Sequence, residues 1–247
     1  MINELVYFFT VFLYFGVVLV LYKLLGKNGI YIYSIFASLL SCVADGRCIS
    51  VFGLPTYPGT VFYASVYLAT DILSEKYGKK EARNAVIYGL VAMILWVLGT
   101  QTTLMFVPNE HDYLGNKLNE VLGMTPRIFI ASMIAYICSQ TFDVFMYHFI
   151  WERTGNNKAM LWVRNNVATC LSQAIDTLTM SAGLVLFGVY PLKTALGFTL
   201  GKYVMKVIIA LLDTPFAYLA RSLNKNKKVA SAISNSACEN EECGVPA

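Results

Sequence analysis

Seven apolar segments follow one another along this 247-residue chain, separated by short polar stretches. A helix that crosses a bilayer needs ~20 mostly apolar residues, so the pattern predicts a bundle of seven transmembrane helices. The second and third segments are short and bounded by Pro and Gly, which leaves six spans as an alternative. The expected helices are Leu5 to Leu25, Ile30 to Ala44, Pro58 to Leu73, Asn84 to Val107, Ile128 to Ile150, Asn166 to Val189 and Ala195 to Ala220.

The same polar phrase occurs in the fifth and the sixth of these segments. The first copy reads Ser139-Gln140-Thr141-Phe142-Asp143 and the second reads Ser172-Gln173-Ala174-Ile175-Asp176. Residues three apart lie on one face of a helix, so each helix points an amide and a carboxylate in the same direction. A carboxylate in a bilayer is unfavourable by ~2.5–3.5 kcal/mol on insertion scales. Because the chain carries this unfavourable arrangement twice, the sequence indicates a binding site for a polar ligand.

Composition supports the membrane interpretation. Hydrophobic residues make up 57% of the chain, charged residues only 14%, and the mean hydropathy is +0.56, whereas soluble domains are about 25% charged. We expect an all-α, polytopic membrane helical bundle in which residues 1–221 form one integral domain. Residues 222–247 are polar and are predicted to be a disordered cytoplasmic tail. The net charge of +4 does not indicate nucleic-acid binding, because the basic residues fall in loops.

The loop charges predict an orientation. With the N-terminus outside, the inner loops and tail hold thirteen Lys and Arg residues and the outer loops hold four. This positive-inside bias places the C-terminus in the cytoplasm, which agrees with an odd number of spans. The inner residues are Lys23, Lys27, Lys76, Lys79, Lys80, Arg83, Arg153, Lys158, Arg164, Arg221, Lys225, Lys227 and Lys228, and the outer residues are Arg47, Lys117, Arg127 and Lys193.

Other charged residues also fall within the segments: Asp71 in the third, and Lys202, Lys206 and Asp213 in the seventh. At 1.5 Å per residue, Lys206 lies ~14 Å from the outer edge, and Asp176 lies at nearly the same depth. The two are therefore expected to pair. Polar groups of this kind can also serve only to hold helices together. Asp71 and Asp213, near the inner ends, can alternatively be expected to reach water or the neighbouring Lys and Arg.

Several chemistries find little support in the sequence. The two histidines and the tail cysteines do not form a metal-ligand cluster, and no P-loop is present, so we expect no metal, no cofactor and no ATPase activity. A retinal photoreceptor would need Lys202 or Lys206 as its Schiff-base site and large aromatic walls, but Trp151 and Trp162 fall at an inner loop. An aspartyl dyad of Asp143 and Asp176 lacks the Gly-rich context of such enzymes.

Four separated motifs, in order, closely resemble those of the queuosine precursor transporter family, also called the vitamin uptake transporter family. The resemblance covers residues 58 to about 221. An acid near a base, within Ser41 to Arg47, replaces an amide pair that the family often carries there, so the substrate within the class stays open. The motifs are Ala69-Thr70-Asp71-Ile72-Leu73-Ser74-Glu75-Lys76-Tyr77-Gly78, Ala135-Tyr136…Ser139-Gln140…Asp143, Leu161-Trp162-Val163-Arg164-Asn165-Asn166…Ser172-Gln173…Asp176-Thr177, and Lys202-Tyr203-Val204-Met205-Lys206-Val207…Leu212-Asp213-Thr214-Pro215-Phe216.

The resemblance implies a multi-pass importer of the bacterial inner membrane, not an enzyme, that carries 7-deazapurines such as preQ0, preQ1 or queuine. Its expected partners are this small flat heterocycle and the lipid bilayer. A carboxylate accepts both donors of a deazaguanine edge, and an amide serves the neighbouring atoms. Asp143 and Asp176 are thus candidate clamps, Gln140 and Gln173 orienting amides, and Lys206 a counter-charge. Phe142, Tyr203 and Trp96 are candidates for stacking on the ring.

One alternative is a substrate-binding subunit of a vitamin or nucleobase uptake system that needs a separate ATPase partner. Basic inner turns such as Lys76 to Arg83 would then dock that partner. Energy coupling and a homo-oligomeric state are both left open by the sequence.

Overall fold

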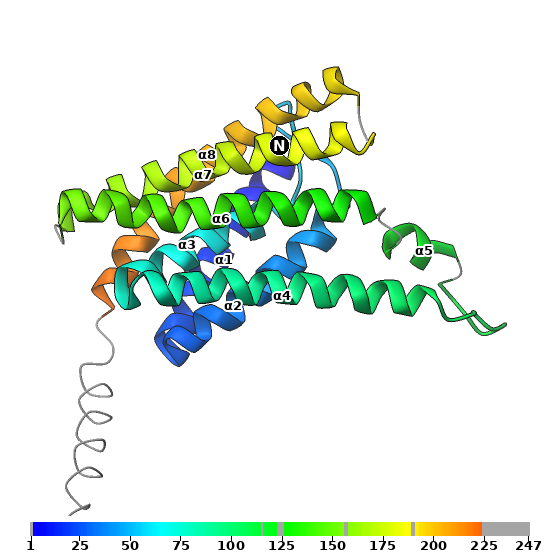
Figure 1. The fold of residues 1–247 in the computed structure, drawn as a ribbon, viewed down its shortest axis with the longest axis horizontal. Coiled ribbons are helices and arrows are strands. Elements are labelled where there is room, and N and C mark those ends of the chain that lie inside the picture. Colours follow the sequence, from blue (N-terminus) through cyan, green and yellow to red (C-terminus); the bar gives the residue numbers. More distant parts are fainter. Residues whose placement is uncertain (1, 115, 123–125, 156–157, 189–190, 224–247) are drawn as a thin grey trace, which may run out of the picture.

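The computed structural model describes residues 2–114, 116–122, 126–155, 158–188 and 191–223, so the predicted tail from residue 224 onward lies outside the described residues. In this part, seven long helices, one short helix and one small β-hairpin follow one another (Figure 1). The long helices are α1 (Ile2–Leu25), α2 (Lys27–Ala44), α3 (Gly59–Tyr77), α4 (Lys79–Leu104), α6 (Pro126–Thr154), α7 (Leu161–Leu186) and α8 (Leu192–Ser222). The other elements are β1 (Ile49–Val51), β2 (Leu54–Thr56), α5 (Asn116–Leu122) and a 3₁₀ turn, η1 (Lys158–Met160).

The mostly helical class predicted from the apolar segments is confirmed, and each segment corresponds to one long helix. Hydropathy underestimated the helices at their polar ends. The third helix continues to Tyr77, and the fourth begins at Lys79, because charged residues at a helix end leave the apolar pattern without breaking the helix. The hairpin and α5 were not predicted, since both lie in stretches read as loops.

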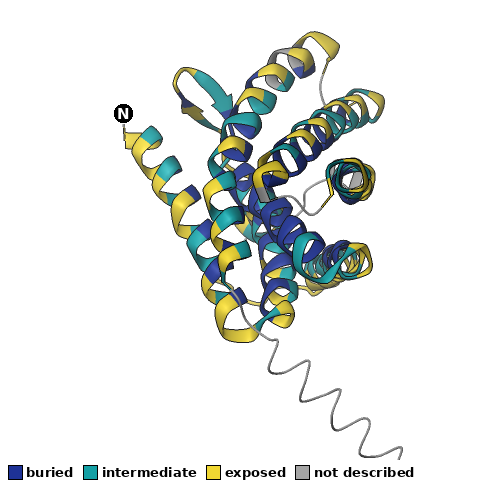
Figure 2. Ribbon diagram, turned by 90° about the vertical axis from the view of Figure 1, so that its left-hand side faces the viewer, coloured by how far each residue is buried: buried dark blue, intermediate teal, exposed yellow. Residues whose placement is uncertain are grey.

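The long helices alternate between the two ends of the bundle, and two of the connections are tight turns. Gly26 and Gly78 have φ of 62° and 85° and reverse the chain between α1 and α2 and between α3 and α4. This left-handed conformation favours glycine. At the opposite end, the hairpin contacts the start of α1, where the Phe52 amide donates to Glu4 (3.3 Å). Figure 2 shows the N-terminus and the hairpin at the same end.

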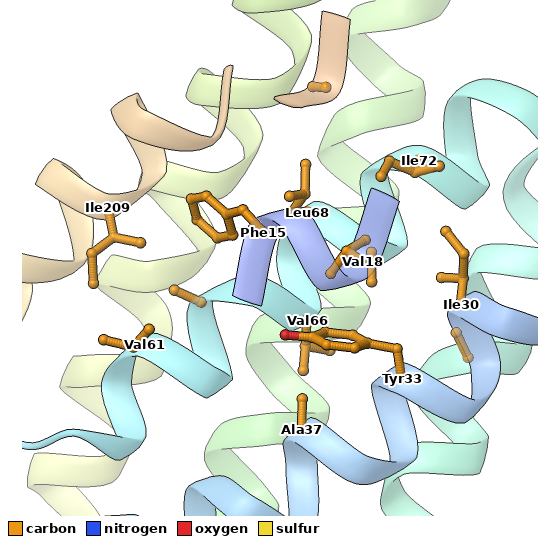
Figure 3. Close-up of a cluster of buried hydrophobic side chains, with 14 of the residues drawn as sticks. Phe15, Val18, Ile30, Tyr33, Ala37, Val61, Val66, Leu68, Ile72 and Ile209 are labelled. Atoms are coloured by element: carbon orange, nitrogen blue, oxygen red, sulfur yellow. The ribbon is translucent and has the colours of Figure 1, made fainter. Parts of the chain in front are cut away.

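Helix α3 is the central element of the bundle. Every residue from Gly59 to Ser74 except Tyr63 is buried, and α3 packs against α1, α2, α4, α6 and α8. Figure 3 shows Val61, Val66, Leu68 and Ile72 of α3 within a cluster that also includes Phe15, Tyr33 and Ile209 from three other helices. The short, Pro- and Gly-bounded segment is therefore the core of the molecule.

The outer surface of the bundle is apolar. Residues such as Leu5, Phe9, Leu95 and Leu98 are exposed on α1 and α4, and Figure 2 shows long exposed faces on the peripheral helices. Exposed apolar surface of this extent is expected where lipid is the solvent. In the described residues, α1, α4 and most of α6 and α8 are long and apolar enough to cross a membrane individually, which supports a multi-pass membrane protein.

Candidate functional site

A cavity of about 380 Å³ extends from the hairpin end of the bundle to the middle of α7 and α8. This volume falls within the ~300–1,000 Å³ typical of small-molecule sites. Both polar and apolar side chains line the cavity, and they come from α2, α3, α4, α6, α7, α8 and the loops near the hairpin. The lining residues are Ser41, Cys42, Asp45, Gly46, Cys48, Tyr57, Thr60, Tyr63, Met93, Phe129, Ser132, Ala135, Tyr136, Asp176, Met180, Leu184, Lys202 and Lys206.

Asp176 is the most highly coordinated polar group of this cavity. Its Oδ1 accepts hydrogen bonds from Tyr63 Oη (2.7 Å) and Ser139 Oγ (3.2 Å). Its Oδ2 forms a buried ion pair with Lys206 Nζ, so the pairing predicted from depth alone is confirmed. The carboxylate is 7% exposed and Lys206 is 6% exposed. Because donors from three other helices hold it, Asp176 presents a fixed negative group to the cavity.

A second pair of charges lies nearer the hairpin. Lys202 Nζ sits 4.1 Å from the ring centroid of Tyr57, and Lys202 and Asp45 attract each other electrostatically. Asp45 directly follows α2 and packs against the start of α3 at Gly59, where any Cβ would collide with the Asp45 carboxylate and the Ser41 carbonyl. The close approach of α2 to α3 therefore requires glycine at this position and brings Asp45 to the cavity wall.

Flat side chains form much of the remaining wall. Tyr57, Tyr63, Phe129 and Tyr136 all line the cavity, and Tyr63 lies 6.1 Å from Tyr136 between ring centroids. Such rings suit a planar ligand. They are different residues from the three predicted to stack: Phe142 and Tyr203 are not among the described lining residues, and Trp96 lines a second cavity of about 400 Å³ that shares Cys42, Gly46 and Phe129 with the first.

The two polar phrases face each other across the α6–α7 interface in a reciprocal arrangement. Ser139 of the first donates to Asp176 of the second (3.2 Å), and Ser172 of the second donates to Asp143 of the first (2.8 Å). The polar surfaces of the two helices therefore face each other. The two aspartates nevertheless differ, because Asp176 lines the cavity, whereas Asp143 is 0% exposed and is not among the described lining residues.

Gln140 and Gln173 also lie within this interface and are not among the described residues that line the cavity. Both are 0% exposed, and neither side-chain amide has a hydrogen-bond partner among the described residues. A buried polar group without a partner is unfavourable by ~1–3 kcal/mol. Their role as orienting amides stays a prediction.

Asp71 and Asp213 are more deeply buried than they would be if they reached water at the inner ends of their helices. They are 2% and 1% exposed, so the expectation that they reach water at the inner ends is wrong. Thr169 Oγ1 donates to Asp71 (3.3 Å), and the Asn165 amide donates to Asp213 (2.5 Å). Their depth follows from the burial of α3 and from the length of α8, neither of which hydropathy reports.

A buried ionic cluster at the inner end was missed by the sequence analysis, which placed its members in charged turns. Arg164 is 0% exposed and donates twice to Glu75, at 2.9 and 3.1 Å. Arg221 pairs with the same carboxylate (2.5 Å), and Tyr147 Oη donates to it (2.7 Å). The four residues join α3, α6, α7 and α8 and close this end of the bundle. Glu75 belongs to the motif Ala69 to Gly78, and this motif is the feature of the sequence from which the cluster could have been found.

The described residues contain no group of three His, Cys, Asp or Glu side chains able to hold a metal ion.

Comparisons with known proteins agree with this architecture. Residues 58–220 match the family described as "Putative vitamin uptake transporter". The chain is 33% identical over 231 residues to the "Probable queuosine precursor transporter" of Bacillus subtilis (strain 168), covering 94% of this chain and 100% of the relative. No solved structure matches the chain. It follows that this protein is a membrane transporter, not an enzyme, and that it belongs to the vitamin uptake transporter family.

Proposed function

We propose that this protein imports queuosine precursors, which are 7-deazapurines such as preQ0, preQ1 or queuine, and that Asp176 and its neighbours bind them. The observation that carries the proposal is a cavity that combines one fixed carboxylate with several aromatic side chains. A deazaguanine offers a ring N–H and an exocyclic amine side by side, and a carboxylate accepts from both. The printed name of the Bacillus relative supports the same class of substrate.

Within this proposal, the cavity residues contact different parts of the substrate. Asp176 accepts from the donor edge of the ring, and Lys206 is the counter-charge of that carboxylate. Lys202, held over Tyr57, donates to the carbonyl side, and Tyr63 or Tyr136 stacks on the ring. Asp143, Gln140 and Gln173 lie behind this wall, so we propose no direct contact between them and the substrate bound in the cavity.

The proposed membrane topology has seven spans, with the N-terminus outside and the C-terminus in the cytoplasm of a bacterium, across its inner membrane. The alternation of seven long helices between two ends supports the odd number, and the excess of basic residues in the loops at one end supports the orientation. In this topology the cavity opens to the outside and the Glu75 cluster closes the cytoplasmic end, as an importer awaiting substrate requires.

Uptake by bacteria that cannot synthesise deazapurines tests this function. Cells that express the protein should regain the modified tRNA when they are fed preQ0, preQ1 or queuine. Asp176→Asn should abolish this rescue, because the uncharged amide no longer accepts two donors. Asp112→Asn is the matched control, since Asp112 lies exposed in the α4–α5 loop. Full rescue by Asp176→Asn protein present at normal levels in the membrane would contradict the assignment.

A substrate-binding subunit served by a separate ATPase remains the second candidate. The observation in its favour is the exposed basic turn formed by Lys79, Lys80 and Arg83 at the start of α4. Uptake by the purified chain alone in liposomes distinguishes the two functions, because a subunit that depends on ATP hydrolysis would bind substrate there without transporting it.

A further inference from the structure

The two polar phrases are arranged reciprocally, but their aspartates have opposite electrostatic surroundings. Asp176 has a cation, Lys206, as its direct partner. Asp143 instead has a second acid, Asp71 on α3, beside it, because the two carboxyl groups accept from Ser172 and Thr169, which lie one turn apart on α7. Two neighbouring carboxylates repel each other in a buried site, so a proton on one of them stabilises the pair.

Of the four carboxyl oxygens of Asp71 and Asp143, only two accept a hydrogen bond from another described side chain. Thr169 donates to Oδ2 of Asp71 (3.3 Å), and Ser172 donates to Oδ1 of Asp143 (2.8 Å). The other oxygens, Oδ1 of Asp71 and Oδ2 of Asp143, are buried and have no hydrogen-bond donor among the described residues. Gln140, fully buried and equally without a partner, lies one turn from Asp143 on the same face of α6.

Charges farther away do not neutralise the pair. The main electrostatic influences on Asp71 are acids: Asp143, Asp213 on α8 and Glu75 on its own helix. Arg164 from α7 and Arg221 from α8 bind Glu75, so this buried region sets four carboxyls against two guanidinium groups. The remaining titratable groups that face it are Tyr67 and Tyr147, which act on Asp143 and Asp71, and Lys76, which donates to the Arg221 carbonyl.

We propose that the Asp71–Asp143 pair is a proton-binding site that couples substrate import to proton entry. The pair lies between the outer cavity and the inner ionic cluster, on helices that both contact the cavity wall. A proton joins a carboxylate oxygen of the pair when the site communicates with the outside, and leaves the same oxygen once the inner cluster opens. The protein therefore carries one proton and one substrate in the same direction. This inference rests on the proposed function.

Proteoliposomes containing the full chain test the coupling directly. PreQ0 is the suitable probe because it is uncharged, so any proton movement belongs to the protein. With one proton per substrate, an interior one pH unit more alkaline sustains about a tenfold accumulation at zero membrane potential. Wild-type protein should approach this ratio, and a pH dye in the lumen should report protons entering with preQ0. Accumulation without proton movement would overturn the inference while leaving the proposed function intact.

Variants test whether the Asp71–Asp143 pair is responsible for the coupling between proton and substrate. Asp71→Asn and Asp143→Asn should reduce the accumulation ratio from about ten to about one, yet retain exchange of labelled for unlabelled preQ0, which needs no net proton transfer. Asp143→Glu keeps a carboxyl group and should retain the response to the gradient. Glu110→Gln, in the exposed loop after α4, is the matched control. Gradient-driven accumulation in both Asn variants would overturn the inference.

Discussion

At the scale of single residues, identical sequence phrases acquire different roles from what lies opposite them. Asp143 and Asp176 stand in the same phrase, and each accepts a hydrogen bond from the serine of the other. Depth along the helix was enough to predict the Lys206–Asp176 pair. The Asp71–Asp143 contact could not be predicted in the same way, because it depends on the rotation of α3 about its axis, and a helix buried on nearly all sides has no amphipathic pattern that reveals it.

Removing one member of the Lys206–Asp176 pair should be more harmful than removing both. Lys206→Met leaves a buried carboxylate without its cation and should destabilise the protein by ~3–5 kcal/mol. The double variant Lys206→Met with Asp176→Asn should recover part of this loss, because no uncompensated charge remains. Thermal unfolding of Lys206→Met, Asp176→Asn and the double variant in detergent measures the effect. Strictly additive losses would contradict a direct interaction between the two side chains.

At the scale of elements, hydropathy located every long helix but misjudged the polar ends and the relative importance of the helices. The segment that looked least secure, Pro58 to Leu73, is the buried centre of the bundle. Helix α3 contains Thr60, Ser65, Thr70 and Asp71 because it faces other helices on all sides and not lipid. Small polar side chains of this kind allow close packing in membrane bundles. The apolar character of a helix in this bundle therefore indicates how much of it contacts lipid, and not how deeply it is buried.

The inner ionic cluster should contribute strongly to stability because it is buried. Glu75→Gln leaves Arg164, which is 0% exposed, facing a neutral partner, and we expect a loss of ~3–5 kcal/mol. Glu81→Gln is the comparison, because its partner Lys27 has a 47% exposed side chain and exposed pairs contribute about 1 kcal/mol or less. Denaturation in detergent measures both. Similar losses in the two variants would show that burial of the cluster does not matter.

At the scale of the whole molecule, the sequence predicted a polytopic bundle and its class of substrate, but not where the site opens. The opening depends on the hairpin and on the stretch around Asp45, which carry no hydropathy signal. The proposed orientation places the exposed thiol of Cys48 in the cavity, on the outer side of the membrane.

Labelling of Cys48 tests orientation and site together. In a variant that keeps Cys48 and carries serine at the other five cysteines of the chain, a membrane-impermeant maleimide should label intact cells, and preQ0 should slow the labelling. Cys48→Ser in the same background is the control and should lose the signal. Labelling that appears only after the cells are permeabilised would reverse the proposed topology, and labelling that preQ0 leaves unchanged would move the substrate away from this cavity.

The unequal apolar character of the helices has a consequence for biogenesis. Four helices, α1, α4, α6 and α8, are apolar enough to partition into a bilayer individually, whereas α2, α3 and α7 do not meet that standard. In the chain each weaker helix directly adjoins a stronger one, with α2 after α1, α3 before α4, and α7 between α6 and α8. We therefore expect the translocon to release each less apolar helix into lipid together with an adjoining, more apolar one. Asp71 on α3 and Asp176 on α7 would thus enter the membrane beside a more apolar helix.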